Sequence, residues 1–235
     1  MNLLDKIVLV TGGSNGIGLS IAEASKEKGA KVIICGRNKN RLESVSEKYG
    51  FTSYVCDVSI EAQVVDMFEN IKRDFGRLDV LINNAGYGYF AEIDKVDVHE
   101  LINVLNTNVV GAILCGRETS KIFKNQNFGN IVNIASTAAL KGFAFGTPYV
   151  ATKFALRGIT ECWRAELRKF NVRVILINPS EVQTDFKLNS GRENSGFNPS
   201  KLQGVDIAAA VVSALEMNDR GFITELTVFA TNPKE

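Results

Sequence analysis

Histidine is nearly absent from this chain of 235 residues, since His99 is the only one. It stands in a polar segment, 95–100, which is typical of a solvated helix face. Serine–histidine–aspartate triads and most zinc sites need histidine in a defined cleft. The sequence therefore disfavours both and predicts no metal site. Proton chemistry is expected instead from Tyr, Lys, Asp, Glu or Cys.

Cysteine is scarce, and its four positions follow no metal-binding or redox spacing. There is no CxxC pair. The pattern favours reduced thiols in the core of a cytoplasmic protein over a disulfide or redox role. The four residues are Cys35, Cys56, Cys115 and Cys162.

A strong charge of one sign and a long apolar run are also missing. The 27 Lys and Arg residues nearly balance the 26 Asp and Glu residues, for a net charge of +1. This balance predicts no nucleic-acid or anionic-membrane partner. No apolar run approaches the ~20 residues of a membrane span. The segment 1–10 has no basic region before its apolar stretch, so it is expected to form a strand and not a signal peptide.

Short runs rich in Val and Ile alternate along the chain with longer stretches of helical character. Such runs are typical of parallel strands covered on both faces. The alternation predicts an α/β fold, with a doubly wound parallel sheet of about seven strands flanked by helices, in one domain over 1–235. The expected strands are Ile7–Val10, Lys31–Cys35, Thr52–Cys56, Val80–Ile82, Ile131–Ile134, Val172–Ile177 and Leu226–Phe229. The expected helices include Ile17–Lys28, Ile60–Phe75, Val98–Phe123, Pro148–Phe170 and Val205–Met217.

A glycine-rich turn, Thr11–Gly18, joins the first expected strand to the first expected helix. Glycine lets the backbone turn sharply and approach a phosphate. The helix N-terminus then offers free N–H groups and a positive dipole end to a pyrophosphate. The Gly-x3-Gly-x-Gly spacing departs from G-x-G-x-x-G. Its position between strand and helix nevertheless favours a dinucleotide site over a purely structural turn.

The second expected strand is followed by Arg37, with Lys39 and Arg41 nearby. A fold that binds NAD normally carries an acidic residue here for the ribose hydroxyls. An arginine can instead hold a 2′-phosphate through two parallel hydrogen bonds. We therefore expect NADP(H) in preference to NAD(H). The alternative is that Arg37 is only a solvated charge at a helix start.

Two further strand ends carry polar or small residues. Asp57 follows the third strand, where it would accept a bond from the adenine amino group or cap the helix near Ile60, a role for which Ser59 is better placed. The segment Asn83–Gly86 follows the fourth strand, where small residues would let backbone lie against the cofactor ribose. Taken alone, that tetrapeptide could be only a turn.

A tyrosine and a lysine are spaced four residues apart on the helix expected after the fifth strand. Thr147 suits its N-cap and Pro148 its first position. The spacing puts Tyr149 and Lys153 on one helix face. An ammonium close to a phenol favours the phenolate, which makes tyrosine a usable acid/base near neutral pH. Such a spacing also arises by chance on amphipathic helices, but Ser136 at the preceding strand end would hydrogen-bond a developing alkoxide.

Together these residues resemble the short-chain dehydrogenase/reductase family in its single-domain branch, from Lys6 to Phe186. The resemblance implies a Rossmann-type fold and a catalytic tetrad of Asn108, Ser136, Tyr149 and Lys153. The asparagine would hold a water that links the lysine to solvent, and the lysine would also bond the nicotinamide ribose.

The resemblance also implies the residues that hold the dinucleotide. The segment Asn178–Thr184 matches the family's Pro-Gly-x-Val-x-Thr stretch, with Ser180 in place of the glycine, and 185–204 would be a substrate lid. The predicted cofactor-binding residues are Gly12, Ser14, Asn15, Gly16, Ile17, Gly18, Arg37, Asp57, Val58, Asn83, Ala85, Gly86, Tyr149, Lys153, Pro179, Val182 and Thr184.

The sequence as a whole predicts an NADP(H)-dependent oxidoreductase that reduces a ketone or aldehyde, or oxidises the alcohol, with Tyr149 as acid/base. One alternative is 3-oxoacyl-carrier-protein reduction, for which Lys187, Arg192 and Lys201 are candidate basic residues and the C-terminal Asp-Gly-Gly is missing. Another is a dinucleotide-sensing module without turnover. The resemblance also implies a homodimer or homotetramer built through the helices that carry Asn108 and Tyr149.

Aromatic and apolar side chains near the expected site predict a largely hydrophobic substrate pocket. Core packing is the rival explanation for some of them. The candidates are Tyr87, Tyr89, Phe90, Phe143, Phe145, Phe186, Leu188 and Phe197.

Overall fold

In the computed structural model, which describes residues 1–184, 186 and 196–232, seven parallel strands form one sheet in the order β3-β2-β1-β4-β5-β6-β9. The order reverses between β1 and β4, as in a doubly wound fold. The expected α/β sheet is confirmed. The strands are β1 Ile7–Thr11, β2 Lys31–Gly36, β3 Thr52–Val55, β4 Val80–Asn83, β5 Gly129–Ile134, β6 Val172–Pro179 and β9 Glu225–Val228.

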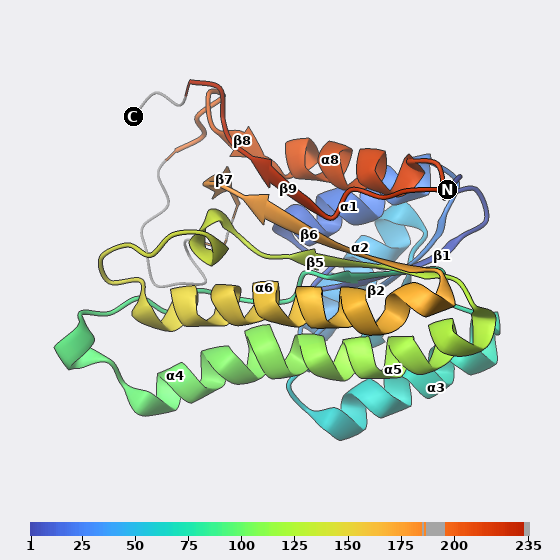
Figure 1. Ribbon diagram of the computed structural model, residues 1–235, viewed down its shortest axis with the longest axis horizontal. Coiled ribbons are helices and arrows are strands. Elements are labelled where there is room, and N and C mark those ends of the chain that lie inside the picture. The colour runs from blue at the N-terminus through green and yellow to red at the C-terminus, as the bar shows by residue number, and fades with distance from the viewer. Residues whose placement is uncertain (185, 187–195, 233–235) are drawn as a thin grey trace.

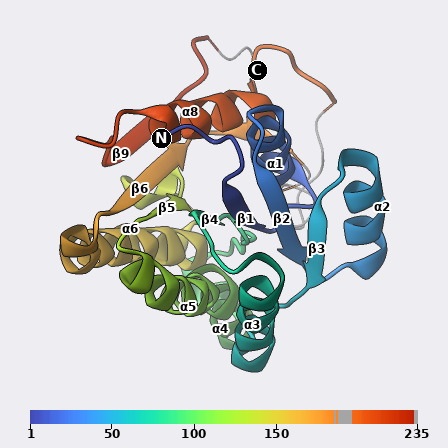
Figure 2. The same cartoon turned by 90° about the vertical axis from the view of Figure 1, so that its right-hand side faces the viewer.

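Helices cover both faces of this sheet (Figures 1 and 2). One layer contains α1, α2 and α8, and the other contains α3, α4, α5 and α6. The central strands are buried along their whole length because both faces are covered, which explains their unbroken Val and Ile runs. The helices are α1 Gly16–Glu27, α2 Lys39–Tyr49, α3 Glu61–Phe75, α4 Val98–Leu105, α5 Gly111–Gln126, α6 Thr147–Leu167 and α8 Gly204–Glu216.

Three local features differ from the sequence-based expectation. The helix α2 was not predicted, because it is polar and buries a single side chain, Leu42. A π-helical turn, η2 (Asn106–Val110), separates α4 from α5. A short parallel pair, β7 (Val182–Gln183) with β8 (Leu202–Gln203), frames the two ends of the segment predicted as a lid. Half of that segment, Leu188 included, lies outside the described residues.

The first helix, α1, and the last helix, α8, pack closely where they begin, because a glycine stands at the contact. α8 begins at Gly204, where a Cβ would come within 2.4 Å of Ser20 Oγ and 3.3 Å of Gly16 O in α1. Only a residue without a side chain lets these two helix starts meet.

One continuous helical segment, Val98–Gln126, is long and apolar enough to span a membrane by length and composition alone. Of the 18-residue stretch that meets this criterion, 33% is buried. The sequence-based expectation considered uninterrupted apolar runs, and this segment meets the length and composition criterion although polar residues interrupt it. The segment contacts α3, α6 and the sheet, as a helix that covers a core does.

All four cysteines are free thiols. Cys35, Cys56 and Cys115 are buried in the core between the sheet and the α3–α5 layer, and burial raises the pKa of each thiol, for Cys56 to about 11. Cys162 is exposed, so the expectation of a core position is wrong for this residue.

Candidate active site

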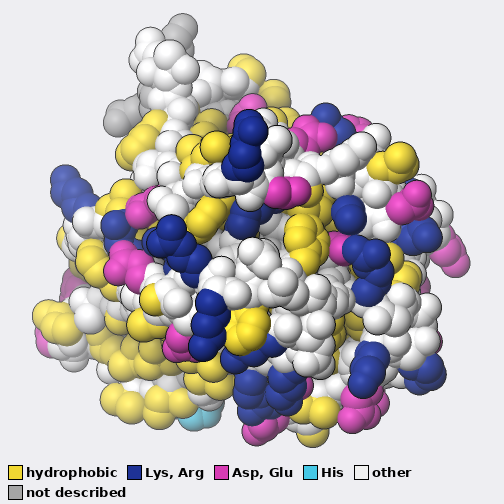
Figure 3. All heavy atoms as spheres, turned by 45° about the vertical axis from the view of Figure 1, so that its right-hand side comes forward, with side chains coloured by type: hydrophobic (Ala, Val, Ile, Leu, Met, Phe, Trp, Pro, Cys, Tyr) yellow, Lys and Arg dark blue, Asp and Glu magenta, His cyan; other side chains and the backbone are white. Residues whose placement is uncertain are grey.

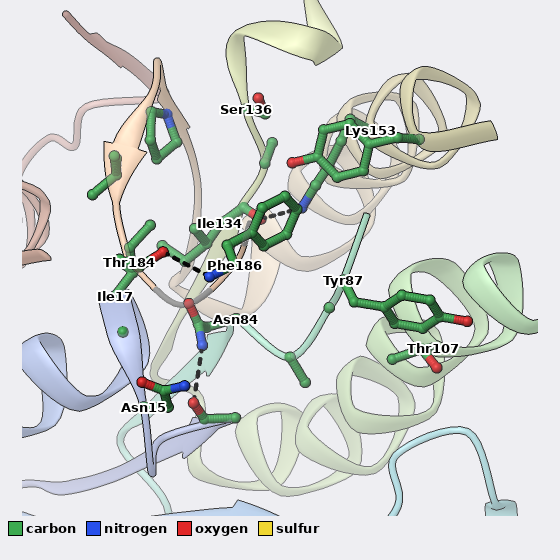
Figure 4. A pocket seen from close by; sticks show the side chains of 18 of the residues that line it. Asn15, Ile17, Asn84, Tyr87, Thr107, Ile134, Ser136, Lys153, Thr184 and Phe186 are labelled. Atoms are coloured by element: carbon green, nitrogen blue, oxygen red, sulfur yellow. Dashed lines mark hydrogen bonds between the residues drawn. The ribbon is translucent and has the colours of Figure 1, made fainter. Parts of the chain in front are cut away.

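A cleft of about 1040 Å³ lies across the carboxyl ends of the strands, on both sides of the β1–β4 switch point. Ligands of open α/β sheets bind at this place. The loops that follow β1, β2, β3, β4, β5 and β6 all contribute to its wall. Figure 4 shows Asn15 and Ile17 at one side of it, and Ser136 and Lys153 at the other. Residues predicted from distant parts of the sequence therefore meet in one cleft.

The glycine-rich turn forms the floor of the cleft under α1. Gly12 and Gly16 have φ values of +64° and +53°, which disfavour any side chain. A Cβ on Gly18 would lie 2.4 Å from Gly12 O, so Gly18 packs behind the turn and does not line the cleft. The N-cap side chain of α1, Asn15, makes no capping hydrogen bond, and the first turn holds no acidic residue. This arrangement fits an anionic group at the helix start.

A group of hydrogen bonds that was not predicted from the sequence holds the glycine-rich turn against the loop after β4. Asn84 Nδ2 donates to Thr11 O (3.0 Å) and Gly12 O (3.3 Å). Thr11 Oγ1 in turn accepts from Asn84 N and Ala85 N, both at 3.0 Å. The adjacent asparagines in the sequence indicated a contact at this point. Which of the two binds the turn depends on which side chain faces it.

The other asparagine of that pair, Asn83, does not line the cleft. It is buried, and its Nδ2 donates to Asn133 Oδ1 (2.9 Å) and to Ala112 O (3.4 Å). Its predicted proximity to the cofactor is therefore indirect. Ala85 and Gly86 do line the cleft. A Cβ on Gly86 would lie 2.9 Å from Asn108 Oδ1, so the glycine permits this approach.

The end of the cleft beyond β2 and β3 is basic. Arg37 and Arg41 line it together with Asp57 and Val58, whereas Lys39 points to Glu43 (3.7 Å) and does not. The Arg37 guanidinium lies 4.0 Å from the Asp57 carboxylate and is 67% exposed. Its exposed donors remain within reach of a ligand at this end.

Asp57 does not cap α3, and neither does Ser59. The Asp57 carboxylate accepts from Ser59 N (3.0 Å) and Ser59 Oγ (2.7 Å), which closes a local turn. Ile60 occupies the N-cap position of α3 without a side-chain bond. The expectation that Ser59 caps this helix is wrong, because its hydroxyl donates to the Asp57 carboxylate instead.

Tyr149 and Lys153 lie on one face of α6 and are both buried, at 8% and 7% exposure. Lys153 Nζ lies 5.6 Å from the centroid of the Tyr149 ring and donates to Ile134 O at 3.0 Å. Burial lowers the pKa of Lys153 to about 8. The predicted pair is thus brought together. The helix starts at Thr147 with Gly146 as N-cap, one residue earlier than expected.

Ser136 lines the cleft near this pair, as predicted. It is the N-cap of the short η3 turn (Thr137–Ala139), and its Oγ accepts from Ala138 N at 3.1 Å. Accepting this bond fixes the oxygen while the hydroxyl proton stays available for donation.

Asn108 is buried in η2 and does not line the cleft. Its Nδ2 donates to Tyr87 O (2.9 Å) and Thr152 Oγ1 (3.1 Å), and its Oδ1 accepts from Tyr87 N (3.0 Å). Both amide hydrogens are therefore used within the protein. Thr152, which the sequence analysis did not single out, donates from its hydroxyl to Tyr149 O at 2.7 Å.

The stretch after β6 also reaches the cleft, through Pro179, Ser180, Val182 and Thr184. Ser180 replaces the family glycine, yet it is not among the residues with positive φ in the part of the chain that the structure describes. Its N–H donates to Val228 O at 2.9 Å. The serine therefore fits this turn without backbone strain.

Four of the predicted pocket aromatics line the cleft: Tyr87, Phe90, Phe143 and Phe186. Tyr89 lies outside it, where its hydroxyl accepts from Asp97 N at 2.8 Å. Phe145 and Phe197 are exposed and do not line the cleft either. Their prediction as pocket residues is wrong, because sequence proximity does not reveal which aromatic of a loop turns inward.

His99 is exposed on α4, as expected. Among the residues with described positions, no group of three or more His, Cys, Asp or Glu side chains could hold a metal ion. The face in Figure 3 shows positive and negative side chains interspersed.

Comparison with known proteins agrees with this geometry. Residues 6–195 match the family described as short chain dehydrogenase. The chain belongs to the short-chain dehydrogenase/reductase family. An uncharacterized oxidoreductase of Staphylococcus saprophyticus is 33% identical over 234 residues, with 97% of this chain and 98% of the relative covered. One of Staphylococcus aureus is 34% identical over 232 residues, with 96% and 97% covered.

Solved structures of the short-chain dehydrogenase/reductase family share the whole fold. A serine dehydrogenase complexed with NADP⁺ has a TM-score of 0.90 at 29% identity, with 94% of each chain covered. A 3-ketoacyl-(acyl-carrier-protein) reductase of Brucella melitensis complexed with NADH has a TM-score of 0.90 at 28% identity, with 97% and 98% covered. An alcohol dehydrogenase of Thermococcus sibiricus with 5-hydroxy-NADP has a TM-score of 0.88 at 25% identity, with 98% and 99% covered. This chain is therefore a short-chain dehydrogenase/reductase oxidoreductase.

Proposed function

We propose that this protein is an NADP(H)-dependent carbonyl reductase, or alcohol dehydrogenase in the reverse direction, with Tyr149 as its general acid/base. One observation carries the proposal. The Tyr149 phenol and the Lys153 ammonium are buried side by side in the same cleft as the glycine-rich turn. Reduction of a carbonyl by a dinucleotide needs a proton donor close to the bound dinucleotide, and a cation beside a phenol assists release of the phenol proton.

The residues of the cleft fit a nicotinamide dinucleotide. Gly12 and Gly16 leave room for phosphates beside the N-terminus of α1. Val182 and Thr184 would face the carboxamide end, and Asp57 and Val58 the adenine end. When bound, the reduced nicotinamide supplies the hydride.

The side chains of the protein would handle the proton. Tyr149 protonates the substrate oxygen as its negative charge grows, and Ser136 donates a hydrogen bond to the same oxygen. Lys153 keeps its charge near the phenol and favours proton release from it. Asn108 fixes the Tyr87 backbone and, through Thr152, the helix turn that carries Tyr149.

NADP(H) is proposed over NAD(H) because of the charge at the adenine end. Arg37 and Arg41 are the cations that line this end among the residues whose positions are described, and guanidinium groups bind phosphate in a bidentate manner. NADP or 5-hydroxy-NADP is the ligand of two compared structures, whereas the 3-ketoacyl reductase holds NADH. The comparison therefore supports a nicotinamide dinucleotide, and the preference depends on Arg37.

Reduction of 3-oxoacyl groups on a carrier protein is the second candidate. It is favoured by the similarity to the 3-ketoacyl reductase. Of the three basic residues considered for a carrier, Lys201 is paired with Glu181 (3.2 Å), and Lys187 and Arg192 lie outside the described residues. We therefore keep a free small carbonyl compound as the proposed substrate, in a cytoplasmic enzyme. A sensing module without turnover is disfavoured because the tyrosine, lysine and serine occupy one cleft.

The decisive experiment is Tyr149→Phe with a panel of ketones, aldehydes and 3-oxoacyl thioesters, followed by NADPH absorbance. Loss of a general acid lowers turnover about 10²- to 10⁴-fold. NADPH binding, measured by fluorescence titration, should stay within about twofold of the parent, because the ring without its hydroxyl still fills the site.

Tyr89→Phe is the matched control, since this tyrosine lies outside the cleft and its hydroxyl accepts from the backbone N–H of Asp97. It should leave turnover unchanged. Turnover in Tyr149→Phe within about threefold of the parent would remove Tyr149 from the mechanism.

A further inference from the structure

Two phenylalanine rings contact the proposed acid/base in the cleft, and a third packs against one of them. The centroids of the Phe90 and Phe186 rings lie 5.3 Å and 5.6 Å from that of Tyr149, with tilted planes. Phe143 continues the row, 6.2 Å from Phe90. Tilted rings at these separations are in favourable aromatic contact. A carbonyl compound bound at Tyr149 would therefore have these rings among its neighbours in the cleft.

The charges of the cleft are placed away from these rings. Within the described lining, the cations are Arg37, Arg41 and Lys153. The two arginines stand at the adenine end, and Lys153 is buried with its Nζ on Ile134 O. Glu181 also lines the cleft and is paired with Lys201 at 3.2 Å. A substrate carboxylate beside the rings would thus meet no available cation among these residues to offset its desolvation.

We propose that the substrate is an uncharged ketone or aldehyde with an aromatic ring next to the carbonyl, held by Phe90, Phe143 and Phe186. This inference rests on the proposed function. Phe90 and Phe186 would contact the ring beside the carbonyl carbon. Phe143, which is 49% exposed, would cover the far side of the ring toward solvent. The outer end of the site is then open, so that substituents on the ring are tolerated.

A matched set of three ketones tests the class. Acetophenone has the ring and no charge, cyclohexyl methyl ketone has a similar size without the π face, and phenylglyoxylate has the ring with a carboxylate. With NADPH in excess, kcat/KM for acetophenone should exceed that for each of the other two about fivefold to tenfold, the range that one or two aromatic contacts supply. Equal or higher kcat/KM for either of the others overturns the proposal.

A pair of variants ties the preference to the rings. Phe90→Leu keeps an apolar side chain but removes the aromatic face, so the ratio of kcat/KM for acetophenone to that for cyclohexyl methyl ketone should fall about fivefold. Phe197→Leu changes an aromatic residue that is 78% exposed and outside the cleft, and it should leave the ratio unchanged. Thermal melts of both variants show whether the fold is retained. A ratio that is unchanged in folded Phe90→Leu contradicts the proposal.

The outcomes also separate this inference from the proposed function. If aliphatic or charged ketones are reduced best, and Tyr149→Phe abolishes that activity, the carbonyl reductase stands and the aromatic preference fails. If no carbonyl compound of the wider panel is reduced, both fail together.

Discussion

The Lys153 ammonium is buried, and its pKa of about 8 lies far below the 10.5 of a free lysine. Desolvation is the cause, since burial disfavours the charged form. Between about pH 8 and 10.5 the unfolded chain binds more protons than the folded one, so this group makes stability rise with pH over that window. Below pH 8 both states hold the proton and the cost of burying it is constant. Burial of the charged Lys153 therefore lowers the free energy of unfolding at neutral pH.

The same titration predicts the pH dependence of activity. The kcat/KM for reduction should fall as the pH rises through about 8, because Lys153 then loses the charge that assists Tyr149. The measurement is a profile from pH 6 to 10 under saturating NADPH. Lys153→Arg keeps a cation that does not titrate there, so whatever activity it retains should decline only at higher pH. A parent profile that is flat up to pH 10 would contradict this role.

Arg37 is expected to determine the preference for NADPH over NADH. Arg37→Asp should lower the preference for NADPH over NADH about 10- to 100-fold, because charge-assisted hydrogen bonds to a phosphate are lost and a repulsive charge is added. The ratio of kcat/KM for the two cofactors measures it. Lys39→Asp is the control, since Lys39 pairs with Glu43 outside the cleft. A parent enzyme that already prefers NADH would refute the Arg37 argument.

Residues whose chemistry follows from local spacing were predicted correctly as neighbours. Tyr149 and Lys153 share a helix face wherever that helix lies, and Gly12 and Gly16 occupy a turn. Asn84 and Thr152 were missed, because their hydrogen bonds join segments more than 40 residues apart in sequence. Which of two adjacent asparagines faces the phosphate turn depends on the strand register, and composition does not encode it.

At the scale of elements, α6 is tied to the π-helical turn η2 through one buried hydroxyl. Thr152→Val should remove the acceptor of Asn108 Nδ2 and the donor to Tyr149 O. We expect the free energy of unfolding to fall by about 1–3 kcal/mol, the cost of an unsatisfied buried donor. We also expect kcat to fall with little change in KM for NADPH. Urea denaturation and steady-state kinetics measure the two effects.

Two controls accompany that variant. Thr152→Ser keeps the hydroxyl and should restore both stability and kcat. Thr119→Val replaces another fully buried threonine, whose hydroxyl has no hydrogen-bond partner among the described residues, and should not destabilise the protein. Equal losses in Thr119→Val and Thr152→Val would show that shape and not the hydrogen bond matters.

The central strands were predicted to within about two residues, since a doubly covered parallel strand leaves a continuous apolar signature. The edge elements carry a weaker signal. α2 has a single buried side chain, and the pair β7–β8 has two residues per strand, so neither produces a readable period. The π turn η2 is invisible to periodicity because the helix continues on both sides of it.

At the scale of the whole molecule, the outer face of α4, η2, α5 and α6 exposes apolar side chains that a monomer rarely shows together. Apolar side chains also gather at the lower left of the face in Figure 3. α4 and α5 each contact α6, so these exposed residues belong to one layer. The exposed members are Val98, Ile102, Val110, Ile113 and Phe154.

We predict that this layer pairs with a second copy of the chain. Light scattering should then give two or four times the chain mass of 25.7 kDa. A double variant, Ile113→Glu with Phe154→Glu, should yield monomers, because unpaired charges would be buried in the contact. Val55→Glu, on the edge strand β3, alters a similarly exposed apolar residue elsewhere and should not change the mass. A monomeric parent protein would refute the prediction.

The missing side chain at Gly204 couples two regions that the sequence separates by nearly 190 positions. Any larger residue there would press on Ser20 and on the carbonyl of Gly16, and the strain would reach the start of α1. A substitution at Gly204, inside the segment predicted as a lid, would thus disturb the helix start at which we propose that the dinucleotide phosphates bind.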